Sequence, residues 1–186
     1  MHPPQGAPRP RAPLDPTELA RFEAAVLPHL DAAYTLARYL MRDPHDAEDA
    51  VQDACLRALR YFVTFRGGDA RAWLLSIVRN RCFSLRQQRR DGSVVAFDEA
   101  LHSDAADAET ADAAALRAAA RESLEAAIRL LPEEFREVIV LREIQGLSYK
   151  EISEVAGVPI GTVMSRLSRA RQRLQHALGP ESAETP

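Results

Sequence analysis

The sequence predicts an all-α fold of two small helical domains joined by an acidic flexible linker, with a helix-turn-helix in the C-terminal domain. Three observations support this fold class. Alanine and arginine dominate the composition, apolar residues recur at spacings of three and four along most of the chain, and no segment alternates as a β-strand does. The chain has 186 residues, which is enough for one or two domains. We expect two folding units.

The first expected helix follows a proline-rich N-terminal tail. Six of residues 1–16 are proline and few are apolar, a composition typical of disordered chain. From Leu19 to Leu40 apolar residues repeat at three and four. This pattern predicts a helix from near Thr17 to about Arg42, bent or interrupted at Pro28.

Two further helices complete the N-terminal domain, which we place at residues 17–90. Asp43 is suited to cap the second helix, with Pro44 at its first position, and Asp69 can cap the third after the Gly67-Gly68 loop. The second helix has an apolar stripe of Ala47, Ala50, Val51, Ala54, Cys55, Ala58, Leu59 and Phe62. The inner side of the third is predicted to contain Trp73, Leu74, Ile77, Val78, Arg81 and Leu85.

Residues 91–121 are expected to form the linker. Residues 91–120 contain seven carboxylates and one arginine, Arg117, whereas residues 164–173 contain four arginines and no acidic residue. The formal net charge of −3 therefore conceals a basic C-terminal segment that could bind nucleic acid. An alternative for the alanine-rich stretch from Ala111 is that it extends the following helix.

The C-terminal domain is placed at residues 122–178, before a short tail at 179–186. Leu124, Ile128 and Leu131 form a first apolar stripe, Pro132 interrupts it, and Phe135, Val138, Ile139 and Ile144 form the next, up to Gly146. Ser148 and Glu151 have capping-box spacing, and Gly157 can end a helix in the left-handed conformation. These signals predict two short helices that meet at Gly157.

The second of these helices combines a buried stripe with an arginine-bearing face. Val163, Leu167, Ala170 and Leu174 recur at spacings of four, three and four. Arg166, Arg169 and Arg173 share another face, with Thr162 and Ser165 nearby, and that face suits a DNA major groove. The alternative is an ordinary solvated surface helix.

Other classes of function find little support in the sequence. Cys55 and Cys82 lie in apolar stripes without metal-ligand or disulfide spacing, so we interpret them as buried thiols. We expect no cofactor and no metal, although His45 with Asp46 leaves open a hydrolase-type metal dyad. The N-terminus lacks a signal-peptide core and no apolar run has the length of a membrane span, so a cytoplasmic protein without membrane insertion is expected.

Four segments, taken in order, resemble one family. They are DAEDAVQDACLRAL (46–59), FRGGDARAWLLSIVRNR (65–81), LPEEFREVIVLR (131–142) and GTVMSRLSRAR (161–171). Together they closely resemble the bacterial extracytoplasmic-function (ECF) sigma factors, a two-domain group of the sigma-70 family. The resemblance covers about residues 17–178. It implies that the N-terminal domain (region 2) binds core RNA polymerase and the minus-ten promoter element, and that the C-terminal domain (region 4) binds the minus-thirty-five element.

The resemblance assigns a polymerase-binding role to the acidic face of the second helix. In the family the matching helix docks on the largest polymerase subunit. The alternative is a solvated acidic face that complements the helix dipole. The candidate residues are Asp46, Glu48, Asp49, Gln52 and Asp53.

The segment from Tyr61 to Asn80 resembles the reader of the single-stranded minus-ten element. Phe62 and Trp73 fit apolar stripes and are interpreted as packing residues, while other aromatic residues could stack on bases. A basic cluster of Arg86, Arg89 and Arg90 suits backbone phosphates. The contact candidates are Phe65, Arg66, Arg79, Asn80 and Arg86.

For the minus-thirty-five element, the resemblance and the helix pattern indicate the helix that begins near Ile160. Many relatives carry arginine where this chain has Met164, so the preferred sequence cannot be transferred from them. Thr162, Ser165, Arg166 and Arg169 are expected to read base edges, and Arg171 and Arg173 to bind phosphates.

The sequence therefore predicts a non-enzymatic sigma factor that directs core RNA polymerase to a restricted set of promoters. The family also implies an anti-sigma factor as a regulatory partner. The alternative is an autonomous helix-turn-helix regulator that binds duplex DNA without polymerase. Such a regulator would need neither the acidic face at 46–53 nor the aromatic loop at 61–65.

Overall fold

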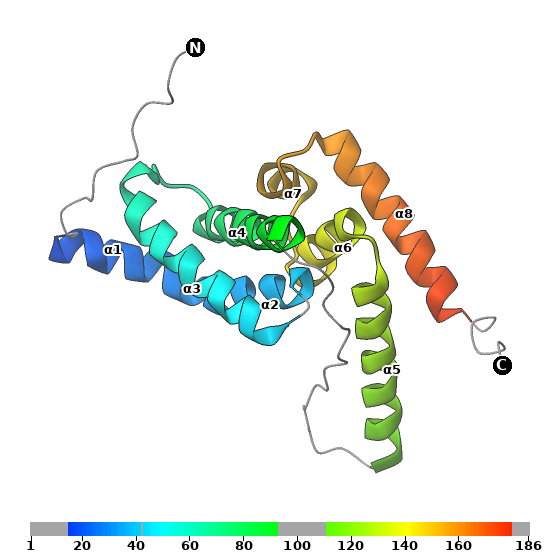
Figure 1. Cartoon of the computed structure of the whole chain (residues 1–186). Helices are drawn as coiled ribbons and strands as arrows, with labels where there is room; N and C mark the ends of the chain where they lie inside the picture. The colour runs from blue at the N-terminus through cyan, green and yellow to red at the C-terminus, as the bar shows by residue number, and fades with distance from the viewer. Residues whose placement is uncertain (1–14, 42, 93–110, 180–186) are drawn as a thin grey trace.

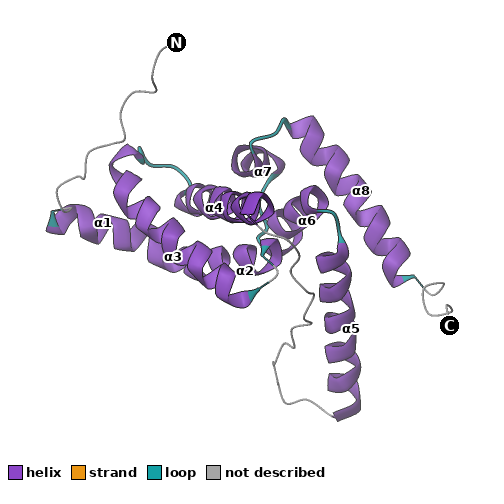
Figure 2. Cartoon of the chain, in the orientation of Figure 1, coloured by secondary structure: helices purple, strands orange, loops and turns teal. Residues whose placement is uncertain are grey.

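The computed structural model describes residues 15–41, 43–92 and 111–179 (Figure 1). Within these ranges every regular element is helical (Figure 2). None of the described helices is both long and apolar enough to cross a membrane. Both predicted tails lie almost entirely outside the described residues, as do residues 93–110 of the predicted linker.

The first helical segment is interrupted at Pro28, as predicted. Helix α1 (Pro16–Val26) begins at a capping box formed by Asp15 and Glu18. A 3₁₀ turn (Leu27–His29) contains the proline and leads into α2 (Leu30–Leu40). Proline lacks the N–H that would continue the α-helical hydrogen bonds, which explains the break.

The other two helices of the first unit pack closely on α2. Asp43 caps α3 (Pro44–Tyr61), and Asp69 accepts backbone hydrogen bonds at the start of α4 (Ala70–Gly92), so both predicted caps are present. The inner face of α3 is made of alanines, whose small side chains allow a close approach of neighbouring helices. The fully buried residues of this core include Leu36, Leu40, Ala47, Ala50, Ala54, Ala58, Leu74, Leu75 and Val78.

The next described helix starts within the predicted linker. Helix α5 (Ala111–Leu130) starts at the alanine-rich stretch, in agreement with the alternative of an extended helix. Pro132 separates α5 from α6 (Glu133–Ile139), and α7 (Tyr149–Ala156) and α8 (Ile160–Leu178) follow. The buried residues of the second unit include Phe135, Val138, Ile139, Leu141, Ile152, Val163 and Leu167.

A π-helical turn (Val140–Ile144) continues α6 and changes which residues face the core. The Gln145 N–H donates to the Val140 carbonyl, five residues earlier, at 2.9 Å. This wider turn shifts the phase of the helix, so Val140 and Leu141 are buried while Ile144, expected in the apolar stripe, is 40% exposed. Leu19 and Leu124, also assigned to apolar stripes, are exposed as well.

The two units pack against each other. Helix α7 lies against α4, and α6 lies against the C-terminal part of α2 (Figure 1). Buried residues of both units belong to one contiguous hydrophobic cluster. The surfaces that carry the candidate site residues are therefore partly turned toward each other.

Candidate nucleic-acid interface

The helix-turn-helix has the predicted caps and turn. The Ser148 N–H donates to Glu151 Oε2 at 2.6 Å, and the Glu151 N–H donates to Ser148 Oγ at 3.3 Å. Gly157 ends α7 with φ +66°, the left-handed conformation that glycine adopts without a Cβ penalty. The Ser153 hydroxyl closes the turn by donating to the Val158 carbonyl at 2.6 Å. The predicted two-helix unit is thus present with its local hydrogen bonds.

The outer surface of α8 displays part of the predicted reading face. Ser165 and Arg169 are exposed, and Met164 is 54% exposed on the same side. The Ser165 hydroxyl donates to the Thr162 carbonyl at 3.0 Å. The Ser165 Oγ atom therefore remains available as a hydrogen-bond acceptor. Exposed Ser168 and Gln172 extend this surface. Met164, Ser168 and Gln172 follow one another at spacings of four, so the helical pattern could have identified the last two as part of this surface.

The other arginines of α8 contact neighbouring side chains or line a cavity. Arg171 Nη2 lies 2.7 Å from Glu143 Oε1, and the Arg173 guanidinium lies 5.3 Å from the centre of the Phe135 ring. Arg166 is half-buried and lines a cavity of about 540 Å³ between α4, α6 and α8. Of the three arginines expected on one face, Arg169 is exposed, Arg166 lines this cavity and Arg173 lies against the Phe135 ring.

That cavity brings candidate residues of both units together. Its wall on α4 contains Arg79, Phe83, Arg86 and Gln87, and its other wall contains Glu133, Glu134 and Glu137 of α6 with Arg166 of α8. Guanidinium and carboxylate groups therefore face each other across the boundary between the units.

Arg79 and Arg86 each form an ion pair with α6. Arg79 Nε lies 2.6 Å from Glu137 Oε1, and Arg86 Nη2 lies 2.9 Å from Glu133 Oε2. Arg86 Nη1 also donates to the Leu40 carbonyl at 3.0 Å, which provides a partner for the C-terminal end of α2. Arg79 Nη1 donates to Oδ1 of exposed Asn80 at 3.1 Å.

Glu137 is a buried charged residue that the sequence did not single out. Its side chain is 1% exposed, and burial raises the pKa of its carboxyl, while the hydrogen bond and charge of Arg79 act in the opposite direction. Charged residues are ordinarily assigned to the surface. The available signal was its position one turn after Glu133 and directly before the apolar pair Val138 and Ile139.

The aromatic loop is mainly a packing feature. Phe62 is buried, as expected, and half-buried Phe65 lies against both Phe62 and Trp73, with ring centres 5.8 and 4.9 Å away. Tyr61 is 44% exposed and Arg66 is exposed just before Gly67. The ring of Phe65 therefore contributes to the first unit's core as well as to its surface.

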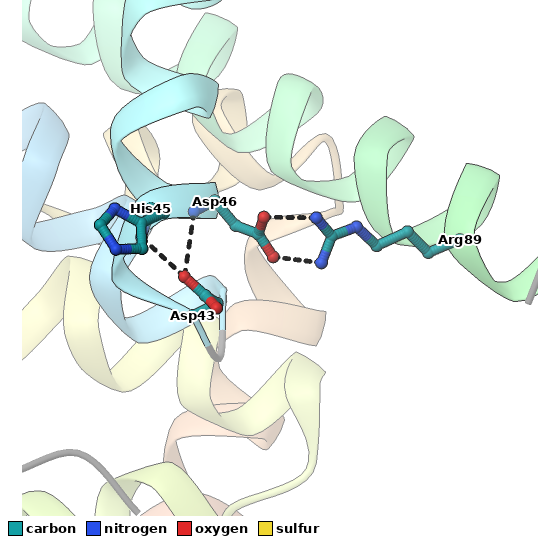
Figure 3. Close-up of polar contacts among 4 residues, drawn as sticks. All are labelled: Asp43, His45, Asp46 and Arg89. Atoms are coloured by element: carbon teal, nitrogen blue, oxygen red, sulfur yellow. Dashed lines mark hydrogen bonds and ion pairs between the residues drawn. The ribbon is translucent and has the colours of Figure 1, made fainter. Parts of the chain in front are cut away.

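The acidic face of α3 divides into two sets. Asp46 pairs with Arg89 of α4 through both carboxylate oxygens (Figure 3), and Asp53 lies 2.5 Å from Arg81 Nε. Arg89, predicted to bind phosphate, is thereby engaged within the unit. The outward set consists of exposed Glu48, Asp49 and Gln52, continued by Leu56, which is 64% exposed.

The start of α3 shows how the possible metal dyad is arranged. Asp43 accepts from the backbone N–H groups of His45 and Asp46 at 2.7 and 3.4 Å, as an N-cap does (Figure 3). The Asp46 carboxylate is engaged by Arg89. Within the described ranges, no three or more His, Cys, Asp or Glu side chains are grouped as metal ligands would be.

Comparisons with known proteins match both units. The sigma-70 region 2 model matches residues 25–91, and the sigma-70 region 4 model matches residues 121–174. The RNA polymerase sigma-H factor of Pseudomonas aeruginosa is 34% identical over 86% of this chain and 86% of its own length. The chain belongs to the sigma-70 family. Its named relatives are RNA polymerase sigma factors, several of them of the ECF group.

Other relatives and solved structures agree with this ECF membership. The ECF sigma factor SigE of Mycolicibacterium smegmatis is 35% identical over 92% of this chain, which spans 66% of that relative's length. The structure of the sigma factor RpoE with the anti-sigma factor NepR from Bartonella quintana matches with a TM-score of 0.70 and 31% identity, covering 87% of this chain and 98% of that one. CnrH in complex with the cytosolic domain of CnrY matches with a TM-score of 0.60 and 27% identity, covering 90% and 91%.

Proposed function

We propose that this ECF sigma factor binds core RNA polymerase and directs it to a restricted set of promoters. The observation that carries the proposal is the presence, in one chain, of both sigma-70 regions in their family order. Each region contains a helix with basic residues, α4 in region 2 and α8 in region 4. Region 2 also carries the outward set of exposed residues on α3. An autonomous DNA-binding regulator would not need region 2. The proposed role involves no catalytic step.

Polymerase docking is assigned to the outward set on α3. Glu48, Asp49 and Gln52 are exposed, so a basic or polar surface can reach them without unfolding the helix. Asp46 and Asp53 complete the candidate face, but their ion pairs with α4 also stabilise the packing of region 2. We therefore assign the direct contacts to the exposed set and a supporting role to the paired aspartates.

Minus-ten recognition is assigned to the loop before α4 and to α4 itself. Arg66 and Asn80 are exposed, and Phe65 borders the same surface, which suits bases turned out of the stack. Arg79 and Arg86 supply guanidinium groups for backbone phosphates. Capture of unstacked bases would favour the open duplex through binding energy alone.

Minus-thirty-five recognition is assigned to α8. Ser165 and Arg169 are exposed beside Thr162, and Arg166 lies at the edge of the same helix; these four are proposed to read base edges. Arg171 and Arg173 are proposed to bind phosphates, for which their present contacts with Glu143 and Phe135 would have to be exchanged.

An anti-sigma factor is the proposed regulatory partner. One similar solved structure contains the sigma factor RpoE with the anti-sigma factor NepR, and another contains CnrH with the cytosolic domain of CnrY. Both match most of this chain, including both of its regions. The proposal for this chain is a protein partner that holds it away from polymerase.

Reconstituted transcription tests the proposed function. Core RNA polymerase is combined with the purified chain on fragments of genomic DNA, and the run-off products are sequenced. We expect a polymerase complex on gel filtration and transcripts that start downstream of a shared pair of elements. If no complex forms and no promoter-dependent transcript appears, the proposed function is wrong.

A further inference from the structure

Two arginines assigned to promoter phosphates are occupied by carboxylates of region 4. Arg79 pairs with Glu137 at 2.6 Å and Arg86 pairs with Glu133 at 2.9 Å. A carboxylate resembles a phosphodiester in carrying one negative charge on oxygen acceptors, and guanidinium groups bind both with the same donors. The carboxylates therefore present to α4 the chemistry of a nucleic-acid backbone.

The two pairs are arranged as a short linear site. Arg79 and Arg86 are seven residues apart, two turns along one side of α4, while Glu133 and Glu137 are one turn apart on α6. The more N-terminal arginine meets the more C-terminal glutamate. Two successive negative groups thus lie along the axis of α4, as the phosphates of a bound strand would.

We propose that Glu133 and Glu137 occupy the positions of two backbone phosphates of the minus-ten strand, so that α4 binds either α6 or single-stranded DNA. This inference rests on the proposed function of α4. The inference adds that α6 of region 4 and single-stranded DNA compete for the same arginines of α4.

Burial makes the two states mutually exclusive. The Glu137 side chain is 1% exposed and that of Arg79 is 20% exposed, and both members of the Arg86–Glu133 pair are about one-fifth exposed, at 22% and 21%. A strand therefore cannot reach these guanidinium groups while α6 remains in place. Glu134, on the same helix and lining the same cavity, is exposed.

A separate contact holds α6 in position without using either arginine of the pair. The π-helical turn ends at buried Gln145, whose Oε1 accepts from Arg71 Nη2 at 2.5 Å and whose Nε2 donates to the Ala32 carbonyl at 3.2 Å. Arg136 Nη1 donates to the Tyr39 carbonyl at 3.1 Å. Gln145 therefore offers a way to loosen the contact between the regions while every charge is kept.

The test measures binding of a fluorescent single-stranded oligonucleotide of roughly a dozen nucleotides to the full chain without polymerase. Phosphate contacts do not depend on sequence, so an oligonucleotide of mixed sequence serves as the probe. We expect Glu133→Gln to raise the affinity about threefold, and Glu133→Gln with Glu137→Gln to raise it about tenfold, because the competing charges are removed. Glu134→Gln is the matched control, since it changes net charge equally on the same helix.

Gln145→Ala provides the second variant, in case a neutral residue at 137 impairs folding. It removes both hydrogen bonds of the amide and leaves the charges unchanged, and we expect tighter oligonucleotide binding here too. Circular dichroism melts establish that each variant is folded. Equal gains in Glu133→Gln and Glu134→Gln, or no gain in folded Gln145→Ala, would overturn the competition.

The outcome is separable from that of the proposed function. Oligonucleotide binding is measured without polymerase, whereas the sigma function is measured by transcription with the wild-type chain. Transcription without the expected affinity gains would reject only the competition. Affinity gains without promoter-dependent transcription would reject the sigma function and leave the competition for single strands standing.

Discussion

A substitution of Asp49 on α3 tests the proposed binding to core polymerase without disturbing the packing of region 2. It is exposed, whereas Asp46 and Asp53 are paired with arginines of α4. We predict that Asp49→Arg weakens binding to core polymerase about tenfold, because like charge would face a basic docking surface, while helicity is unchanged. Affinity is measured by titration with labelled core polymerase.

Glu23→Arg is the control for this experiment. Glu23 is exposed on α1 and undergoes the same change of charge on another part of region 2. It should bind polymerase as the wild type does. Equal losses in both variants would indicate a general charge effect and would remove the docking role of α3.

Cys82 illustrates how burial controls the chemistry of a single side chain. It is buried as expected, and burial raises the pKa of its thiol to about 12. Because the thiolate is the reactive form, we predict that Cys82 resists alkylation by iodoacetamide at neutral pH until the chain is unfolded. Mass spectrometry of the modified peptides measures this. Rapid labelling of Cys82 in the folded chain would contradict the prediction.

Two glycines near the start of α8 are predicted to have opposite effects on stability. Gly157 has φ +66°, whereas Gly161 lies inside α8, and a Cβ added at either position meets no atom within 4 Å. Gly157→Ala should therefore lower the free energy of unfolding by about 1 kcal/mol through backbone strain alone. Gly161→Ala should raise it by up to about 1 kcal/mol, because alanine restricts the unfolded chain.

Urea denaturation of the two variants measures both changes. Each substitution adds one methyl group within the same helix-turn-helix, so each serves as the other's control. A loss of stability in Gly161→Ala as large as that in Gly157→Ala would show that a general packing effect, rather than backbone conformation, determines the result.

At the scale of helices, the sequence predicted most of what depends on neighbouring residues. The Asp43-Pro44 start, the Ser148–Glu151 capping box and the Gly157 turn are local signals, and all three are present. The phase of α6 was not predictable in this way. No local pattern marks its π-helical turn, at the end of which Ile144 lies at the surface and Gln145 in the interior.

The candidate site was less predictable than the helices, for a physical reason. Helical spacing places Arg166, Arg169 and Arg173 near one another, but it does not reveal which of them meets a residue from another helix. The carboxylate partners of Arg79 and Arg86 lie more than 40 residues away in the chain. Such contacts depend on how the two regions pack, which no local pattern encodes.

For the whole molecule, Glu137 links stability to pH. Burial raises the pKa of its carboxyl above the ordinary 4.5, so the folded chain keeps this proton at pH values where the unfolded chain has released it. Folding then binds a proton, and the free energy of unfolding falls as pH rises from 4.5 to the raised pKa. We predict that Glu137→Gln removes this contribution to the slope.

Urea denaturation at several values between about pH 4 and about pH 8 measures the slope in both proteins. Exposed Glu134→Gln is the control, and it should retain the wild-type pH dependence. An identical slope in the wild type and Glu137→Gln would show that the buried carboxyl does not contribute as its environment indicates.

Gln145 affects the contact between the two regions without taking part in the proposed recognition of DNA. Its amide joins α4 to α2 from the end of the π-helical turn, yet it belongs to neither the exposed face of α8 nor the ion pairs of α4. Substitutions there would alter how readily the two regions separate, while the side chains proposed to read bases would be unchanged. Natural selection could thus change how readily the two regions separate without changing which promoter sequences the protein prefers.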